Sequence, residues 1–138
     1  MKKFRFALSA VLILIFIAGL ITVGQAAEMK IAMVTDVGGV NDQSFNQSAW
    51  EGLKRAEKDF GIKVAYKESK QDADYAPNME TLTDAGYVLI WGIGFLMGDA
   101  IKETAEINRD QKYAIIDFSY GPETPKNIAC AVVQEEEP

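Results

Sequence analysis

Short apolar runs alternate along this chain with amphipathic stretches of ten to seventeen residues, and this alternation is the strongest constraint on its fold. We expect the apolar runs to form strands at residues 31–34, 62–66, 87–91, 113–116 and 128–133. The amphipathic stretches predict helices at residues 44–60, 76–85 and 97–108. Strands that alternate with helices of this length form parallel sheets with right-handed crossovers. The sequence therefore predicts an α/β fold with a doubly wound parallel sheet.

The longest expected helix, at residues 44–60, carries its apolar side chains on one stripe, which we expect to face the sheet. Gln47 follows Ser44 by three residues, which is the spacing of a capping box at a helix start. Gly61 is suited to end the helix. The residues of the stripe are Phe45, Ala49, Leu53, Ala56 and Phe60.

Three of the expected loops leave the sheet at one edge, because the carboxyl ends of parallel strands lie together. The loop after the first strand contains Asp36 and leads to Phe45. Gly94 and Phe95 follow the third strand, and Asp117 follows the fourth. Ligands of open α/β sheets bind at this edge. We therefore expect a cleft there, with carboxylates, an aromatic face and bare backbone.

The first 27 residues have the layout of a secretory signal peptide. Lys2, Lys3 and Arg5 precede an apolar run at residues 7–23, and small residues follow as far as Ala27. The alternative is an uncleaved transmembrane anchor, since roughly 17 apolar residues reach the lower end of what spans a bilayer. Either arrangement places the rest of the chain outside the cytoplasm, in the periplasm or on the extracellular face of the membrane.

Residues 28–138 suffice for one modest domain and are strongly acidic, with 11 basic and 20 acidic side chains and a net charge of −9. This charge argues against binding nucleic acid, because phosphate contact needs clustered Lys and Arg. The chain has no histidine, which removes the usual general base and zinc ligand. Cys130 is the only cysteine, so no intrachain disulfide is possible. We expect no metal, no cofactor and no enzymatic activity.

Four segments of the sequence carry a family resemblance. They are TDVGGVNDQSFNQSAWEGL from Thr35, DADYAPNMETLTDAGY from Asp72, WGIGF from Trp91 and QKYAIIDFSYG from Gln111. They resemble the basic membrane protein family, the substrate-binding components of ABC importers that capture purine nucleosides. The resemblance implies a type I periplasmic-binding-protein fold, in which two lobes close on the nucleoside, and an ABC transporter permease as partner.

The resemblance also implies a set of ligand-binding residues. In that family an aromatic residue of the first loop stacks on the base, which here is Phe45, while carboxylates and amides bind the base and the ribose. Positions matched to the family motifs and to the shared sheet edge make up the expected site. Its residues are Asp36, Asn41, Phe45, Asn46, Gly94, Phe95 and Asp117.

This sequence departs from the family pattern in two respects. It stops just after the expected fifth strand, before a second lobe, a hinge return and a partner aromatic residue. The cysteine that accepts lipid in family members is missing. We therefore expect the chain to be an N-terminal lobe fragment that supplies one half of the interlobe cleft.

Several of these residues also have purely structural interpretations. Phe45 can begin the apolar stripe of its helix as a core residue. Asp36 and Asp42 can accept backbone N–H groups in a turn and at a helix start. Gly92 and Gly94 can serve a tight turn. We favour a packing role for Trp50 and Trp91. We leave the roles of Tyr75 and Tyr120 open.

Two other functional classes remain as alternatives. Residues 92–98 read G-x-G-x-x-x-G after a strand, which is close to a dinucleotide-binding fingerprint, although the spacing and the position in the chain differ. The other alternative is a membrane-tethered regulatory or interaction domain that uses the same lobe without transport. Association with a permease and nucleoside binding would favour transport, and a co-purified nicotinamide would favour an enzyme.

Overall fold

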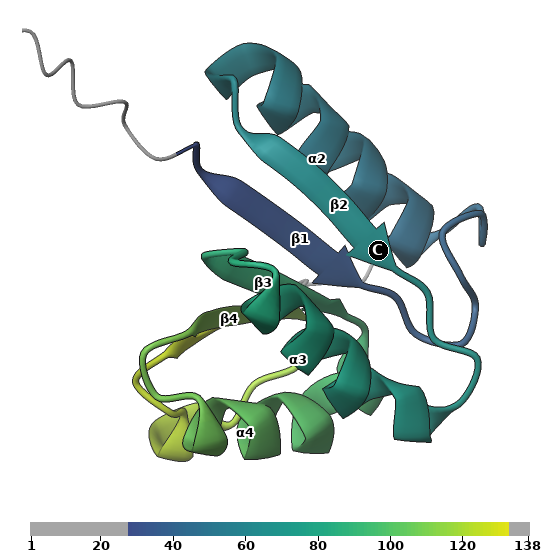
Figure 1. Ribbon diagram of the computed structural model, residues 1–138. Coiled ribbons are helices and arrows are strands. Elements are labelled where there is room, and N and C mark those ends of the chain that lie inside the picture. The colour runs from purple at the N-terminus through teal and green to yellow at the C-terminus, as the bar shows by residue number, and fades with distance from the viewer. Residues whose placement is uncertain (1–27, 133–138) are drawn as a thin grey trace, which may run out of the picture.

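The computed structural model describes residues 28–132, which form a five-stranded parallel sheet with helices on both faces (Figure 1). The strand order is β2-β1-β3-β4-β5. This confirms the predicted α/β fold with a doubly wound parallel sheet. The expected signal peptide and residue 133 of the expected fifth strand lie outside the described residues. The strands are β1 (Lys30–Val34), β2 (Lys63–Lys67), β3 (Leu89–Ile93), β4 (Lys112–Ile116) and β5 (Ile128–Ala131).

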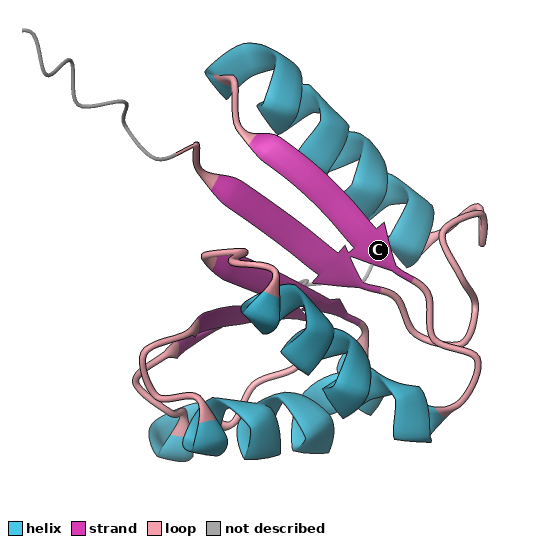
Figure 2. Ribbon diagram, in the orientation of Figure 1, coloured by secondary structure: helices cyan, strands magenta, loops and turns pink. Residues whose placement is uncertain are grey.

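Three α-helices connect the first four strands, and they divide unequally between the two faces of the sheet (Figure 2). Helix α2 (Phe45–Phe60) covers one face, while α3 (Tyr75–Asp84) and α4 (Gly98–Ile107) cover the other. Within residues 28–132 no helix is long and apolar enough to cross a membrane. Short 3-10 helices complete the connections: η1 (Asp72–Asp74), η2 (Phe95–Met97) and η3 (Gly121–Glu123).

Helix α2 agrees with its prediction in extent but only partly in packing. Gly61 ends the helix in a left-handed conformation (φ 65°), as expected, and its N–H donates to Glu57 O. Ala49 and Leu53, in the middle of the predicted stripe, pack on the sheet. Phe60 at the end of the stripe is 78% exposed. The stripe is therefore a packing face only over its middle turns.

The core lies mainly between the sheet and the pair α3 and α4. Alternate residues of each central strand face the two sides, so Ala32 and Val34 point to this large cluster while Met33 points to α2. The cluster under α2 is small and consists of Met33, Val40 and Ile93 with partly buried neighbours. The two faces thus differ in how completely they are covered.

Strand β3 begins and ends two residues later than the expected strand at 87–91. Val88, which we expected inside the strand, is 51% exposed. Gly92, which we expected in the following loop, is a strand residue on the face of β3 that packs against α4. A Cβ at Gly92 would lie only 2.2 Å from Ile101 Cδ1, so the glycine allows α4 to approach the sheet closely.

The strand order reverses between β1 and β3, the two neighbouring strands from which the chain departs in opposite directions. From β1 the chain continues through α2 to β2, and from β3 through α4 to β4 on the opposite side. Loops that diverge in this way create the usual ligand-binding position of an open α/β sheet. The loops after β1 and β3 therefore delimit the place to look for a site.

Candidate functional site

Asp36 lies two residues after β1 and is held in position through one of its carboxylate oxygens. Gly38 N–H donates to Asp36 Oδ1 at 2.9 Å, and Asn46 Nδ2 donates to the same oxygen at 2.7 Å. Within residues 28–132 no hydrogen bond reaches the other oxygen, Oδ2, which is directed toward Gly94 across the switch point. Asp36 therefore keeps one acceptor oxygen for a further partner.

Asp42 caps the start of α2. Its carboxylate accepts hydrogen bonds from the backbone N–H groups of Ser44 (2.9 Å), Asn46 (3.0 Å) and Gln47 (3.0 Å). Burial alone would raise the pKa of Asp42, but these N–H groups and the Asn46 side chain together hold the pKa below its usual value. The Ser44 side chain makes no capping bond, so the predicted capping box is wrong and the structural interpretation of Asp42 is correct.

Asn46 connects the carboxylates of Asp36 and Asp42. Its Nδ2 donates to Asp36 Oδ1 at 2.7 Å and to Asp42 Oδ2 at 3.0 Å, and the residue is only 1% exposed. Its Oδ1 is buried and has no hydrogen-bond partner among the described residues. We predicted Asn46 as a ligand contact, but both amide hydrogens are used inside the protein. Its geometry suits a role in positioning Asp36.

Tyr75, whose role the sequence left open, lies buried next to this cluster. It is 1% exposed, and burial followed by the nearby carboxylates of Asp72 and Asp36 raises its pKa to about 12. Like Asn46 Oδ1, the Tyr75 hydroxyl has no hydrogen-bond partner among the described residues. Unsatisfied buried polar groups are rare in proteins, and two of them adjoin Asp36.

Phe45 and Asn41 are the expected site residues that reach the surface of this loop. Phe45 is the first residue of α2 and is 48% exposed. Asn41 is also exposed. Phe45 directly precedes Asn46, whose side chain is hydrogen-bonded to both carboxylates. The geometry does not favour the interpretation of Phe45 as a core residue.

Gly94 brings the loop after β3 close to Asp36. Its φ of +103° is accessible to glycine and rarely to other residues, and a Cβ there would lie 3.3 Å from Asp36 Oδ2. Phe95, which follows, is 59% exposed. The glycine therefore keeps the space beside Oδ2 open, between one exposed aromatic residue on each loop.

Asp117 follows β4 in a left-handed conformation that is unusual for a residue other than glycine (φ 66°). Its N–H donates to Ala131 O at 2.7 Å, which fixes the backbone, and the residue is half-buried. Ile93 pairs with Ile116 across β3 and β4, so Gly94 and Asp117 follow neighbouring strand ends. Strained backbone of this kind is frequent at functional sites.

The aromatic residues after Asp117 have a packing role. The Phe118 ring lies where a Cβ at Gly98 would come within 2.9 Å of it, and the Tyr120 hydroxyl donates to Gly98 O at 2.5 Å. Burial, followed by the charges of Cys130 and Asp99, raises the pKa of Tyr120 to about 12. Gly92 and Gly98 are thus both explained by close packing, which removes the main support for a dinucleotide fingerprint.

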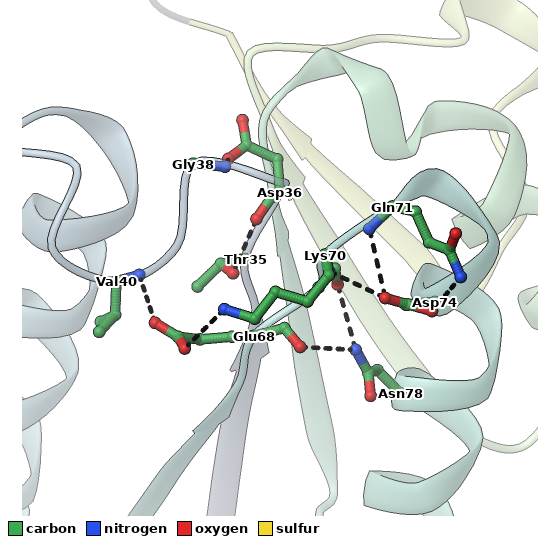
Figure 3. Close-up of polar contacts among 10 residues, drawn as sticks. Thr35, Asp36, Gly38, Val40, Glu68, Lys70, Gln71, Asp74 and Asn78 are labelled. Atoms are coloured by element: carbon green, nitrogen blue, oxygen red, sulfur yellow. Dashed lines mark hydrogen bonds and ion pairs between the residues drawn. The ribbon is translucent and has the colours of Figure 1, made fainter.

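Glu68, which directly follows β2, also lies at this edge and was not among the predicted site residues. Glu68 Oε1 accepts a hydrogen bond from Val40 N–H at 3.0 Å, so the loop after β2 is tied to the loop after β1 (Figure 3). A charged residue at the carboxyl end of a strand was the available signal.

An apolar groove lies between α2 and the sheet. It has a volume of about 190 Å³ and offers almost no hydrogen-bonding group to a ligand. We therefore do not assign it as the ligand site. Among residues 28–132 no group of three or more acidic or cysteine side chains is arranged to hold a metal ion. The groove is lined by Met33, Ala49, Gly52, Leu53, Trp91, Ile93 and Ile116.

Comparisons with known proteins agree on one family. A family model described as ABC transporter substrate-binding protein PnrA-like, Bmp, matches residues 29–138. The CD4+ T-cell-stimulating antigen of Listeria monocytogenes is 42% identical over 95 residues, which are 65% of this chain and 27% of that protein. The ABC transporter nucleoside-binding protein BmpA of Lactococcus lactis is 38% identical over 114 residues, covering 80% of this chain and 32% of that protein.

Solved structures show the same relationship. An ABC transporter solute-binding protein from Aeropyrum pernix K1 is 31% identical and superposes with a TM-score of 0.67, over 74% of this chain and 28% of that one. The chain therefore spans about a quarter to a third of the length of each of these three relatives. Its fold is that of one lobe of a type I periplasmic binding protein.

Proposed function

This chain belongs to the Bmp family of ABC transporter substrate-binding proteins, and on that premise we propose that its carboxyl-edge loops form one face of a purine nucleoside site. The family consists of substrate-binding components of transporters rather than enzymes. The name of the Lactococcus relative, a nucleoside-binding protein, supports the choice of ligand. The site residues that we propose are Asp36, Asn41, Phe45, Gly94, Phe95 and Asp117.

The observation that carries the proposal is an exposed phenylalanine and a carboxylate with a free oxygen, both on the segment that follows β1. Phe45 is 48% exposed at the start of α2, and Asp36 Oδ2 faces the bare backbone of Gly94. A purine base is flat and carries N–H groups at its edge, while a ribose carries hydroxyl donors. An aromatic face and a carboxylate oxygen at the same sheet edge match these two chemical features.

The magnitudes predict weak binding by this face alone. Stacking of a base on Phe45 is worth about 1–3 kcal/mol. A charge-assisted hydrogen bond to Asp36 or Asp117 adds about 1.5–3 kcal/mol each. Association costs several kcal/mol, so one face leaves a dissociation constant near or above about 1 mM. Tight capture requires a second surface that closes on the other side of the ligand.

Transport also requires export and a membrane partner, which we include in the proposal. Cleavage after Ala27 would release the domain outside the cytoplasm, where it delivers the ligand to an ABC transporter permease. Intact-mass measurement of the protein from its host tests this part. A mass that corresponds to a start at Glu28 is expected, whereas a membrane-bound protein that retains Met1 would favour the anchor.

The ligand assignment is tested by NMR titration of the isotope-labelled, exported chain with inosine, adenosine and guanosine. We expect millimolar purine nucleoside to shift the amide signals of Asp36, Phe45 and Gly94. Ribose alone and uridine serve as controls and should shift them much less. Absence of any perturbation at several millimolar of all three purine nucleosides would contradict the proposal.

A further inference from the structure

Glu68 reaches from the end of β2 to the neighbouring loop that carries Asp36 and Phe45. Its Oε1 accepts the backbone N–H of Val40 at 3.0 Å, a contact between residues 28 positions apart in the sequence. Glu68 is an exposed residue, and its side chain is 33% exposed. The carboxylate thus joins two loops at the surface of the domain (Figure 3).

Gly39 is adapted to this contact. Its φ of +71° is in the left-handed region, and a Cβ at this position would lie 3.1 Å from Glu68 Oε1. Any larger side chain would be strained by the backbone and would press on the carboxylate. The glycine before Val40 therefore provides both the turn and the space that the Glu68 carboxylate needs.

Glu68 is itself held from the other side by α3 and the segment before it. Asn78 Nδ2 donates to Glu68 O at 3.2 Å and to Ser69 Oγ at 3.1 Å. Asp74 accepts the N–H of Lys70, two residues after Glu68, at 2.8 Å. Lys70 Nζ lies 3.5 Å from Glu68 Oε2 but is 78% exposed, so this ion pair contributes little. The main connection runs from α3 through Glu68 to Val40.

Val40 is the point where this connection meets the proposed site. It is 5% exposed, and its side chain packs with Met33 and Ile93 under α2. Asn41 and Asp42 follow it directly, and Asp42 sets the start of α2 at Phe45. A shift of Val40 would therefore displace the residues that we assign to the ligand.

We propose that Glu68 is a positioning residue that holds the β1–α2 loop in the shape required for ligand binding. Glu68 touches no ligand in this proposal, and it acts through Val40 N–H. The expected effect on affinity rests on the proposed function, whereas the effect on the loop does not. Without an acceptor for Val40 N–H, the segment between Gly39 and Asp42 loses its attachment to the β2 side of the sheet.

The test compares three variants of the full chain: Glu68→Leu, Glu68→Gln and Glu103→Leu. Leucine removes the acceptor at similar size, glutamine retains an acceptor oxygen without the charge, and Glu103 is an exposed control on α4. The first measurement is hydrogen exchange and the chemical shift of the Val40 amide in the absence of ligand. The second is the change in amide shifts on titration with inosine.

Glu68→Leu should accelerate exchange of the Val40 amide by about tenfold or more and weaken inosine binding by a similar factor. Glu68→Gln should restore most of the protection and most of the binding, and Glu103→Leu should change neither. Unchanged Val40 exchange in Glu68→Leu would overturn the proposal, and so would an exposed Val40 amide with unchanged affinity. If the unmodified chain binds no nucleoside, the proposed function fails, while the exchange data still decide whether Glu68 holds the loop.

Discussion

Phe45 and Asn46 are neighbours with opposite environments, and this contrast explains how the first turn of α2 serves a site. Phe45 is 48% exposed, whereas Asn46 is 1% exposed and donates to both Asp36 and Asp42. Successive residues of a helix point about 100° apart, so one can face outward while the next faces the sheet. In the proposed site the outward residue would contact the ligand, and the inward residue would orient Asp36.

The first prediction concerns this outward residue. Phe45→Ala should weaken purine nucleoside binding by about tenfold, because stacking on an aromatic ring is worth roughly 1–3 kcal/mol. The melting temperature should change little, since the side chain is already half exposed. NMR titration with inosine measures the affinity. Phe60→Ala, at the far end of α2, is the control and should leave binding unchanged. A large fall in melting temperature with unaltered affinity would assign Phe45 to the core instead.

Which residues make up the candidate site was easier to predict than the role of each residue in it. Asp36, Gly94 and Asp117 could be placed at the carboxyl edge because each follows a strand, and the apolar runs predict the order of the strands. The inward orientation of Asn46 depends on how α2 packs against the sheet and on its hydrogen bonds to Asp36 and Asp42, which local sequence does not specify. The contact between Glu68 and Val40 joins segments 28 residues apart, and no local pattern encodes it.

At the scale of the helix, the stability of α2 depends on Asp42 rather than on Ser44. Three backbone N–H groups donate to the Asp42 carboxylate, and no side-chain capping bond comes from Ser44. These bonds require no particular residue at position 44. Asp42, two positions before Ser44, gives the helix a negatively charged cap. This charge also interacts favourably with the positive end of the helix dipole.

The second prediction is therefore that Asp42→Ala lowers the free energy of unfolding by about 0.5–2 kcal/mol, whereas Ser44→Ala has little effect. The folded-state pKa of Asp42 lies below its usual 3.8. Its stabilisation is thus complete above about pH 4 and is lost as the pH falls through the folded pKa. Urea unfolding at a series of pH values should show the difference between the two proteins narrowing below pH 4. A constant difference down to pH 2 would contradict the ionic cap.

The third prediction uses two glycines in different elements. Gly92→Ala should lower the free energy of unfolding by about 1–3 kcal/mol, because its Cβ would lie 2.2 Å from Ile101 Cδ1. Gly52 lies within α2 and has nothing within 4 Å of its Cβ position, so Gly52→Ala should stabilise by up to about 1 kcal/mol. Urea denaturation of both variants measures the two changes. Equal changes in the same direction would mean that the close approach of α4 to β3 is wrong.

The order of strands and helices could be predicted from hydrophobic periodicity, while their ends depended on contacts between elements. The segment at 44–60 differs from α2 by a single residue, because its pattern is long and Gly61 ends it. The expected strand at 87–91 was displaced by two residues, because Gly92 reads locally as a turn residue. Only the packing of Ile101 against it, nine positions later, makes a glycine suitable within the strand.

Taken as a whole molecule, the domain has one well-covered face and one partly covered face. Two helices and a large cluster of buried residues protect the side of α3 and α4, while α2 is the one described helix on its side. The apolar groove between α2 and the sheet continues toward β4 at Ile116. Strand β5 pairs only with β4 among the described strands, so its other edge has no strand partner there.

The last prediction is that the chain by itself associates reversibly with a second copy through this side. Ala129 and Ala131 are exposed on β5, and Val132 directly after the strand is 60% exposed. An unpaired strand edge next to an apolar groove favours association, and a lysine placed on the edge opposes it.

Ala131→Lys should therefore shift the protein toward monomer in sedimentation velocity at about 100 μM, with little change in stability because the side chain is exposed. Val88→Lys, at a 51% exposed position before β3, is the matched control and should not shift it. Nucleoside should compete with association only if the second copy also covers the carboxyl edge. A protein that is monomeric at this concentration before any substitution would contradict the prediction.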